Sequence, residues 1–375
     1  MSFTVKGWCP GALRPMLSGD GFVVRVRPVL AELTAAQVLG LCAAAETFGA
    51  GLIDITNRAN LQIRGVTEAV LPALRAELGT LGLIDPDIET ETRRNILVAP
   101  MWATGDDTHR LARELTARLG EFPALPPKVG FAVDAGPGPV LGAVPADFRI
   151  ERGADRGLIL RPDGRARGIA LAPGAEIDTL IRLADWFVAS GGAEAGRMVR
   201  HPAPLPDWAG DLRTPAVPRA QLRPGVHALG AVQGCAFGQV RARALVQAVG
   251  DSGAAAIRVT PWRALLLLDA APGPREGLIW DADAPELRAD ACPGAPSCPQ
   301  ASVETRTLAR RLAPHVAGHL HVSGCAKGCA HPAPADVVIT GESGAYGVAF
   351  QARAGDPMTH RGLSADQVLA RFGAA

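Results

Sequence analysis

The sequence has little of what would direct it to a membrane, to a nucleic acid or to an oxidising compartment. Its 375 residues carry a net charge of +1, so no overall field would attract nucleic acid or an anionic membrane surface. The N-terminal segment lacks the long apolar run of a signal peptide, and the leucine run at 265–268 ends at Asp269, far short of a membrane span. We therefore expect a cytoplasmic protein with no membrane and no nucleic-acid partner.

Lysine is scarce, and the number of cysteines is odd. Only three of the 38 basic residues are lysine, which distinguishes Lys128 and Lys327 from the arginine background. Seven cysteines in a long chain without a secretion signal indicate metal or redox chemistry rather than a disulfide framework. Three of them, Cys9, Cys42 and Cys235, suit buried apolar positions.

One order of elements (strand, helix, strand, strand) occurs twice along the chain. The first copy has strands at 21–30, 51–57 and 59–66 and a helix that Thr34 caps, and the second has strands at 226–234, 255–261 and 264–270 around a helix near 241–253. In this alignment Ile55-Thr56 falls opposite Val259-Thr260. The duplication predicts two α+β halves that pair about a pseudo-two-fold axis and leave a cleft between them.

The segments outside the duplication follow other patterns. Between the copies we expect a helix at 105–120, a strand at 126–136, a hairpin turning at 162–164 and a helix at 175–192. The proline-rich stretch 201–225 lacks periodicity and predicts a linker. In the last hundred residues we expect a helix directly after Cys298 and strands at 319–323 and 335–341.

The strongest motif is a pair of cysteine loops, C-x5-C at 292–298 and C-x3-C at 325–329. Four thiolates from two loops can surround a [4Fe–4S] cluster, and glycine and proline let the loops wrap closely around it. The helix expected after Cys298 would favour its thiolate form. Structural zinc and four unliganded cysteines are the alternatives, but zinc sites commonly use tighter C-x2-C knuckles. The predicted cluster ligands are Cys292, Cys298, Cys325 and Cys329.

This spacing resembles the cluster signature of the sirohaem-containing sulfite and nitrite reductases. Within that group, the segment SGCAKGCAHPAPADV at 323–337 is most similar to the precorrin-3B synthases of aerobic cobalamin biosynthesis. In the reductases, the last cysteine of the second pair also bridges the cluster to the sirohaem iron. The matching residue in this sequence is Cys329.

Three further segments resemble those that line the tetrapyrrole and substrate site of this group: 56–64 (TNRANLQIR), 93–96 (RRNI) and 125–128 (LPPK). The resemblance implies that Arg58, Asn60, Gln62, Arg64, Arg94, Asn95 and Lys128 bind substrate, and that Arg58, Arg94 and Lys128 also act in catalysis. Several arginines suit a ring with eight carboxylates, because a guanidinium binds carboxylate in bidentate fashion and keeps its charge when buried. Each arginine alone could equally be a solvated residue on a strand face.

One position at which this sequence departs from the reductase pattern separates the reductases from the synthases. The reductases place a second lysine two residues after the L-P-x-K lysine, where this sequence has Gly130. Losing a pocket cation weakens the binding of a small anion, while glycine would open space for a larger organic guest. Together with the short chain, this makes sirohaem unexpected here and favours the synthases.

The resemblance to the synthases implies oxidation of precorrin-3A by dioxygen to precorrin-3B, with a hydroxyl at C20 and a γ-lactone from the ring A acetate. It also implies a mononuclear non-haem iron beside the cluster. No 2-His-1-carboxylate spacing is evident; His331 is the nearest candidate ligand, and His319 and His321 could share a strand face, although each could be an ordinary core histidine. Because no Rossmann or flavin motif occurs, electrons should come from a separate NAD(P)H-dependent reductase or a ferredoxin. The product could pass to the next precorrin methyltransferase.

The fold expected from this resemblance is α+β and nitrite/sulfite reductase-like, with two pseudo-symmetric ferredoxin-like half-domains and two α/β domains that enclose a tetrapyrrole cleft. The expected segments are 1–85 (first half-repeat), 86–200 (central α/β domain with the basic pocket residues), 201–272 (linker and second half-repeat) and 273–375 (cluster-binding domain). Two other functions stay open: a sirohaem-dependent nitrite or sulfite reductase, and a non-enzymatic iron–sulfur electron-transfer protein.

Overall fold

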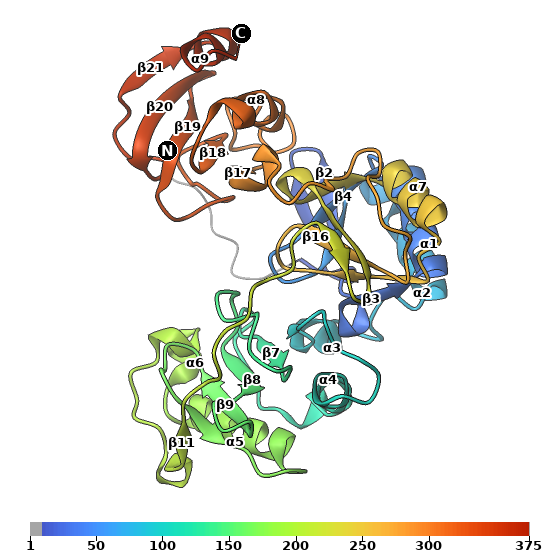
Figure 1. The fold of residues 1–375 in the computed structure, drawn as a ribbon, viewed down its shortest axis with the longest axis vertical. Coiled ribbons are helices and arrows are strands. Elements are labelled where there is room, and N and C mark those ends of the chain that lie inside the picture. Colours follow the sequence, from blue (N-terminus) through green and yellow to red (C-terminus); the bar gives the residue numbers. More distant parts are fainter. Residues whose placement is uncertain (1–9, 375) are drawn as a thin grey trace.

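The fold is described from a computed structural model, which describes residues 10–374. It contains four β-sheets with helices packed on them, which confirms the α+β class (Figure 1). The C-terminal domain (red) and the central domain (green) lie at opposite ends of the long axis, with the two half-domains (blue and yellow) at mid-height. Among the described residues, no helix has the length and apolar content needed to cross a bilayer.

The first half-domain has the strand order β1-β2-β5-β4. Its elements are β1 (Met16–Ser18), β2 (Gly21–Val26), α1 (Ala35–Phe48), β4 (Leu52–Ile55), β5 (Leu61–Val66) and α2 (Leu71–Thr80). Thr34 caps α1 as predicted: its hydroxyl accepts from the Gln37 amide, and the Gln37 side chain accepts from the Thr34 amide. This capping box satisfies two amides that the first turn would leave unpaired.

The second half-domain repeats this arrangement with the order β12-β13-β16-β15. Its elements are β12 (Gly225–His227), β13 (Gly230–Gly234), α7 (Ala242–Ser252), β15 (Ala256–Val259) and β16 (Ala264–Leu268). The single strand expected at 226–234 is in fact the antiparallel hairpin β12–β13. Gly230 begins the second strand at a φ of +140°, and a Cβ there would lie 2.0 Å from the Leu267 carbonyl oxygen, so only glycine fits.

The two half-domains exchange a strand. β3 (Glu32–Thr34) leaves the first half and pairs with β15, while β14 (Gln239–Arg241) leaves the second half and pairs with β4. Short 3-10 turns, Val29–Ala31 and Ala236–Gly238, precede the exchanged strands, and one buried core contains residues of both halves. The two half-domains therefore form one body, because neither sheet is complete without the other half.

The central domain is a six-stranded sheet in the order β11-β10-β9-β8-β7-β6. Its strands are β6 (Ile96–Val98), β7 (Phe131–Asp134), β8 (Phe148–Arg152), β9 (Leu158–Pro162), β10 (Gly168–Ala170) and β11 (Leu212–Arg213), and its helices are α3 (Ile88–Arg93), α4 (Asp107–Ala117), α5 (Glu176–Ala189) and α6 (Gly192–Ala195). The predicted hairpin is β9–β10. β11 lies within the stretch expected to be a linker, so part of 201–225 completes this sheet by pairing with β10.

The C-terminal domain is a five-stranded sheet in the order β17-β18-β19-β20-β21. Its elements are β17 (Ala289–Ala291), α8 (Arg306–Leu312), β18 (Leu320–Ser323), β19 (Ala335–Glu342), β20 (Ala345–Ala352), β21 (His360–Leu363) and α9 (Ala365–Arg371). The helix expected directly after Cys298 was wrong, because α8 begins at Arg306. Residues 299–305 are instead held as a loop: the Ser302 amide donates to the Gly324 carbonyl, and the Tyr346 hydroxyl donates to the Glu304 carbonyl.

The central and C-terminal domains share one topology. In each, a parallel strand pair is joined through a helix, a third parallel strand follows, and antiparallel strands and a further helix complete the domain. The registers correspond as well: Leu97 pairs with Ala132 in the central sheet where Asp290 pairs with His321 in the C-terminal sheet. The duplication therefore includes these two domains in addition to the half-domains.

Candidate functional site

The four predicted cluster cysteines lie on two neighbouring loops of the C-terminal domain. Cys292 directly follows β17, Cys298 lies further along the same loop, and Cys325 and Cys329 lie between β18 and β19. All six cysteines that the structure describes are free thiols. The parallel pairing of β17 with β18 puts both loops at the same sheet edge, which brings the two cysteine pairs together.

The two cysteine loops interlock through backbone contacts that need small residues. The Gly324 amide donates to Cys292 Sγ at 3.2 Å. A Cβ on Gly324 would lie 2.5 Å from the Ala301 Cβ, and Gly294, at a φ of +68°, lies directly against Thr305. Amide donation to sulfur and close backbone approach are both features of iron–sulfur ligation.

The other three cysteines of the two loops are among the groups that act on the pKa of Cys329. Burial raises the pKa of Cys329; Lys327 opposes this shift, whereas Cys292, Cys325 and Cys298 reinforce it. By contrast, burial raises the pKa of both Cys42 and Cys235 to about 12, as expected for inert apolar cysteines. Cys9 lies outside the described residues. A set of four clustered thiols fits the donor requirement of an iron–sulfur cluster.

A cleft of about 610 Å³, which we call the cluster cleft, opens beside these loops. Its lining includes Cys292 and Cys329 together with the guanidinium-bearing residues Arg25, Arg64, Arg263 and Arg306. Two carboxylates, Asp54 and Asp290, also line it. A space with four guanidinium groups beside two cysteine thiols suits an anionic ligand.

Two predicted substrate residues, Gln62 and Arg64, line the cluster cleft. Gln62 Oε1 accepts from Arg25 Nε at 3.0 Å and from Nη2 at 2.7 Å, and so orients that arginine. Arg64 is buried and forms ion pairs with Asp20 at 2.7 Å and Asp54 at 3.4 Å. Because Arg64 Nη2 also donates to the Ser297 carbonyl at 3.2 Å, it fastens the first half-domain to the first cysteine loop.

The remaining predicted substrate residues lie outside that lining. Arg58 Nη2 donates to the Lys128 carbonyl at 3.0 Å, so these two residues lie together. Asn95 Nδ2 donates to the Val129 carbonyl at 2.8 Å. Their proposed roles in binding stay predictions.

Arg94 and Asn60 line a much smaller space of about 10 Å³. Asp85 accepts from Arg94 at Nε and at Nη2, at 2.7 and 2.8 Å, and Nη1 donates to the Arg27 carbonyl. All three nitrogens of the Arg94 guanidinium group therefore have protein partners. Its substrate role stays a prediction that this geometry does not favour.

The structure explains glycine at position 130 differently from the sequence-based expectation. A Cβ there would lie 2.7 Å from Asn95 Nδ2, and the Gly130 amide donates to Asp147 Oδ2 at 3.0 Å. The residue is buried. The expectation that glycine opens space for a guest was therefore wrong, because Asn95 fills the space that a side chain would take.

Sequence interpretation missed Arg25, Arg263, Arg306 and Asp290 as cleft residues. A signal for Arg263 existed: aligning Thr56 with Thr260 places Arg263 opposite Ala59, next to the predicted Arg58, and both positions have a positive φ (53° and 55°). No sequence motif around Asp290 indicated that it would line the cleft. Its position depends on strand pairing between residues that are distant in sequence.

Asp290 contacts two histidines beside the second cysteine loop. Its Oδ2 lies 2.8 Å from His319 Nε2 and 3.1 Å from His331 Nδ1, while its Oδ1 lies 2.8 Å from Arg263 Nη1. Burial would raise the pKa of Asp290, but the His319 hydrogen bond and the charge of Arg263 outweigh it and lower that pKa. Two histidines and a carboxylate thus meet in space although the sequence showed no such spacing.

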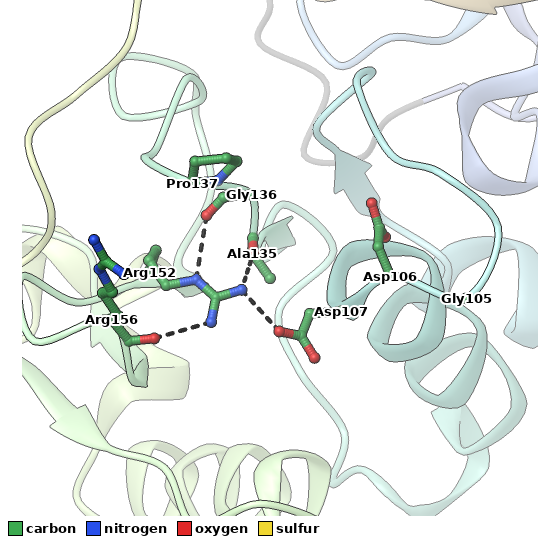
Figure 2. Close-up of a pocket in the computed structure, with 8 residues that line it drawn as sticks. All are labelled: Gly105, Asp106, Asp107, Ala135, Gly136, Pro137, Arg152 and Arg156. Carbon is green, nitrogen blue, oxygen red and sulfur yellow. Dashed lines mark hydrogen bonds and ion pairs between the residues drawn. The ribbon is translucent and has the colours of Figure 1, made fainter.

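The central domain has a cleft of about 820 Å³ at the matching edge of its own sheet, and Figure 2 shows its lining. Arg152 lies in the middle of this cleft (Figure 2). Its Nη2 donates to Asp107 Oδ2 at 2.7 Å and to the Ala135 carbonyl, while Nε donates to the Gly136 carbonyl and Nη1 to the Arg156 carbonyl. No cysteine lies in this lining. The central-domain cleft therefore lies at the sheet edge that corresponds to the cysteine loops, but its lining has no thiols.

Three comparisons place the chain among known proteins. The model of the nitrite/sulfite reductase ferredoxin-like half domain matches residues 14–81. A protein from Sinorhizobium sp. named precorrin-3B synthase is 34% identical over 382 residues, which cover 92% of this chain and 82% of that protein. The solved structure of the Mycobacterium tuberculosis NirA protein superposes with a TM-score of 0.59 at 18% identity, over 92% of this chain and 78% of the other, and it shows a common fold.

Proposed function

This chain belongs to the precorrin-3B synthase family, and from that premise we propose that it oxidises precorrin-3A to precorrin-3B in aerobic cobalamin biosynthesis. One atom of dioxygen would enter the ring as the C20 hydroxyl while the ring A acetate closes a γ-lactone. The other atom would leave as water, which takes up two electrons and two protons. The substrate would thus gain one oxygen atom in all.

The observation that supports this proposal best is the composition of the cluster cleft. A ring with many carboxylates needs several guanidinium groups, and four line the cleft beside Cys292 and Cys329. Because Asp20, Asp54 and the Ser297 carbonyl already engage Arg64, the arginines proposed to bind the substrate are Arg25, Arg263 and Arg306. Arg306 Nε is buried and has no hydrogen-bond partner within residues 10–374. The Arg306 side chain as a whole is 18% exposed in the cleft, so a carboxylate of the substrate would reach its guanidinium group there.

The side chains of the cleft are held ready for such a ligand. Gln62 orients Arg25, Asp54 contacts Arg306 at 3.4 Å, and Asp290 holds Arg263. These contacts reduce the side-chain freedom that binding would otherwise remove. Lys128 and Arg58, which lie together outside the cleft lining, are proposed to serve in substrate binding or catalysis from the other side of the ring.

The cofactors belong to the same proposal. Cys292, Cys298, Cys325 and Cys329 would hold a [4Fe–4S] cluster, which supplies single electrons, while a mononuclear non-haem iron supplies oxygen activation. Lys327, inside the second cysteine loop, would favour the reduced cluster by its charge. Sirohaem is not part of the proposal.

The proposed partners are an electron donor and an enzyme that receives the product. The absence of a Rossmann or flavin motif supports a separate NAD(P)H-dependent reductase or a ferredoxin as the electron donor. The next precorrin methyltransferase is proposed to receive the product.

The proposal is tested with anaerobically purified, cluster-loaded protein, precorrin-3A, a reducing system and isotopically labelled dioxygen. Mass spectrometry should show a product that has gained one labelled oxygen atom, and its lactone should be visible by NMR. Unchanged precorrin-3A under conditions in which the cluster is reduced and reoxidised by oxygen would overturn the proposal. Sirohaem absorption with consumption of nitrite or sulfite would favour the reductases, and electron transfer without either reaction would favour a carrier protein.

A further inference from the structure

We propose that Asp290, His319 and His331 bind one divalent transition-metal ion, with the buried His321 next to it. This inference deepens the proposed function, since it gives the oxygen chemistry a location. Metal binding by these residues can nevertheless be measured without precorrin-3A, so the two proposals can fail separately.

The three ligand atoms already have the spacing that one ion requires. His319 Nε2 and His331 Nδ1 lie 2.8 and 3.1 Å from the same oxygen of Asp290, and all three atoms lie within 4.8 Å of one another. Ligands about 2.1 Å from an ion, at right angles to each other, are roughly 3 Å apart. The two contacts of Asp290 have this spacing, and the group has the composition of the 2-His-1-carboxylate sites of non-haem iron oxygenases.

The fold explains why these residues meet. Asp290 on β17 pairs in register with His321 on β18, so the two lie on neighbouring strands. His319 is two residues before His321 and therefore points to the same face of the sheet. His331 reaches this face from the loop that contains Cys325 and Cys329.

The duplicated domain shows that the fold does not require polar residues here. By the common register, Asp290, His319 and His321 correspond to Leu97, Gly130 and Ala132 of the central domain. Leu97 and Ala132 are buried in the apolar core that the half-domains share. Three polar side chains at the matching positions thus need an explanation beyond packing.

His321 supplies an independent observation. It is fully buried, and neither of its ring nitrogens has a hydrogen-bond partner within the part of the chain that the structure describes. Its ring lies 5.7 Å from that of His331 and borders Gly328 in the second cysteine loop. A buried imidazole with two unsatisfied nitrogens indicates a missing partner, and an ion or its bound water would be one.

Arg263 would serve as a positioning residue for this site. Its Nη1 lies 2.8 Å from Asp290 Oδ1 and also donates to the Ala289 carbonyl. The contact leaves Oδ2 directed at the two histidines. Fixing a ligating carboxylate by a second contact is a common feature of metal sites.

The location of the site connects it with both the cluster and the solvent. Asp290 lines the cluster cleft with Cys292 and Cys329, while His331 lines a second cleft of about 910 Å³ on the other side. His331 follows Cys329 by two residues, which spans at most about 7 Å of backbone. Three protein ligands leave positions on an ion for water or a small oxygen ligand such as dioxygen, which could enter by the second cleft.

The test uses manganese(II) as the probe and anaerobic protein with its cluster loaded and oxidised, after a chelator has removed any iron outside the cluster. Free manganese(II) has an EPR signal that decreases on binding, so a titration measures both stoichiometry and affinity. We expect one ion per chain in the wild type. His319→Ala, His331→Ala and Asp290→Asn should each weaken binding at least about tenfold, while the cluster spectrum shows that the variants are folded. His315→Ala, an exposed histidine four residues before His319, is the matched control and should bind like the wild type.

No manganese binding by the cluster-loaded wild type, or equal binding by the wild type and all three ligand variants, would overturn the site. The iron content of protein purified without added manganese provides a second measurement: the wild type should hold iron in excess of its cluster, and His319→Ala should not. Binding by the wild type together with unaltered precorrin-3A would retain the site and reject the proposed reaction. Conversion of precorrin-3A by His319→Ala at the wild-type rate would instead reject the site's part in the oxygen chemistry and retain the reaction.

Discussion

The central and C-terminal domains have the same topology but opposite chemistry on one face of the sheet. In both, the face that packs on the domain's own helices is apolar, with Val98 and Val133 in one and Ala291 and Val322 in the other. The other face has Leu97 and Ala132 in the central domain, where the C-terminal domain has Asp290 and His321. One copy of the duplication therefore has an apolar face in the half-domain core, while the other has polar donors at the matching positions.

The loops at the sheet edges differ in the same way. The C-terminal loops hold four cysteines and border a cleft in which Arg306 has an unpaired buried nitrogen. The corresponding central loops hold no cysteine among the residues that line their cleft, and there Arg152 is fully engaged by Asp107 and by carbonyl groups (Figure 2). The two sheets thus have similar topology but different edges. At the central-domain edge, protein groups engage the arginine, whereas the C-terminal edge leaves donors for a ligand.

The largest effect should come from removing a thiol of the C-terminal copy. Cys325→Ala should abolish the cluster, because three protein thiolates leave one iron of a [4Fe–4S] cluster without a ligand. Visible absorption and EPR of anaerobically prepared protein measure this. Cys42→Ala removes a buried apolar cysteine from the half-domain core and should keep the cluster. A cluster of wild-type intensity in Cys325→Ala would contradict the assignment.

Giving the central copy the polar residue of the C-terminal copy should cost stability. Leu97→Asp puts a carboxylate into the shared core where no histidine or arginine compensates it, so the free energy of unfolding should fall by about 3–5 kcal/mol. Urea denaturation followed by circular dichroism measures the change. Leu39→Asp, at an exposed position of α1, should change it by less than about 1 kcal/mol. Equal decreases in the free energy of unfolding of the two variants would show that position 97 does not require an apolar residue.

A pH-dependent difference should come from Asp134, the last residue of β7, whose counterpart at the end of β18 is the uncharged Ser323. Burial raises the pKa of Asp134 to about 6, although the amides of Leu141 and Val140 donate to it and oppose the shift. Because the folded-state pKa lies above the ordinary aspartate pKa of 3.8, the carboxyl contributes stability below about pH 4 and loses it as the pH rises through about 6.

Relative to Asp134→Asn, the wild type should therefore lose up to about 3 kcal/mol of unfolding free energy between pH 4 and pH 7. Urea midpoints measured across this range for both proteins give the difference. Asp251→Asn, at an exposed position of α7, is the control and should follow the wild-type curve. A constant difference between wild type and Asp134→Asn across the range would show that Asp134 titrates normally.

Local sequence signals were sufficient for the elements and for the thiol loops. Thr34 with Gln37 specifies the start of α1, and glycines with small neighbours allow the cysteine loops to interlock, because both depend on residues close in the chain. The strand exchange between half-domains could not be predicted, since β3 and β15 are more than two hundred residues apart. The helix expected after Cys298 failed because tertiary contacts from Gly324 and Tyr346 hold that segment as a loop.

The same limit applies to the candidate site. Asp290 and His319 meet only because β17 and β18 pair in parallel through α8, so their separation in sequence has no metal-site pattern. Arg94 looked like a free cation in sequence, yet Asp85 engages it in bidentate fashion. Motifs therefore located the two cysteine loops, whereas the histidines and the cleft arginines required the register of the sheets.

The smallest expected effect compares one arginine from each cleft. Arg306→Gln should weaken binding of precorrin-3A about tenfold, because one charge-assisted hydrogen bond to a carboxylate contributes on the order of 1.5 kcal/mol in a partly exposed site. Arg152→Gln is the matched control and should leave the affinity unchanged, since Asp107 and three carbonyls already engage its guanidinium group. An anaerobic absorbance titration measures both dissociation constants, and a steeper loss of affinity with salt in the wild type and Arg152→Gln than in Arg306→Gln would show that charge is responsible. If Arg152→Gln weakened binding and Arg306→Gln did not, the substrate would occupy the central-domain cleft, and the division of labour between the two copies would be reversed.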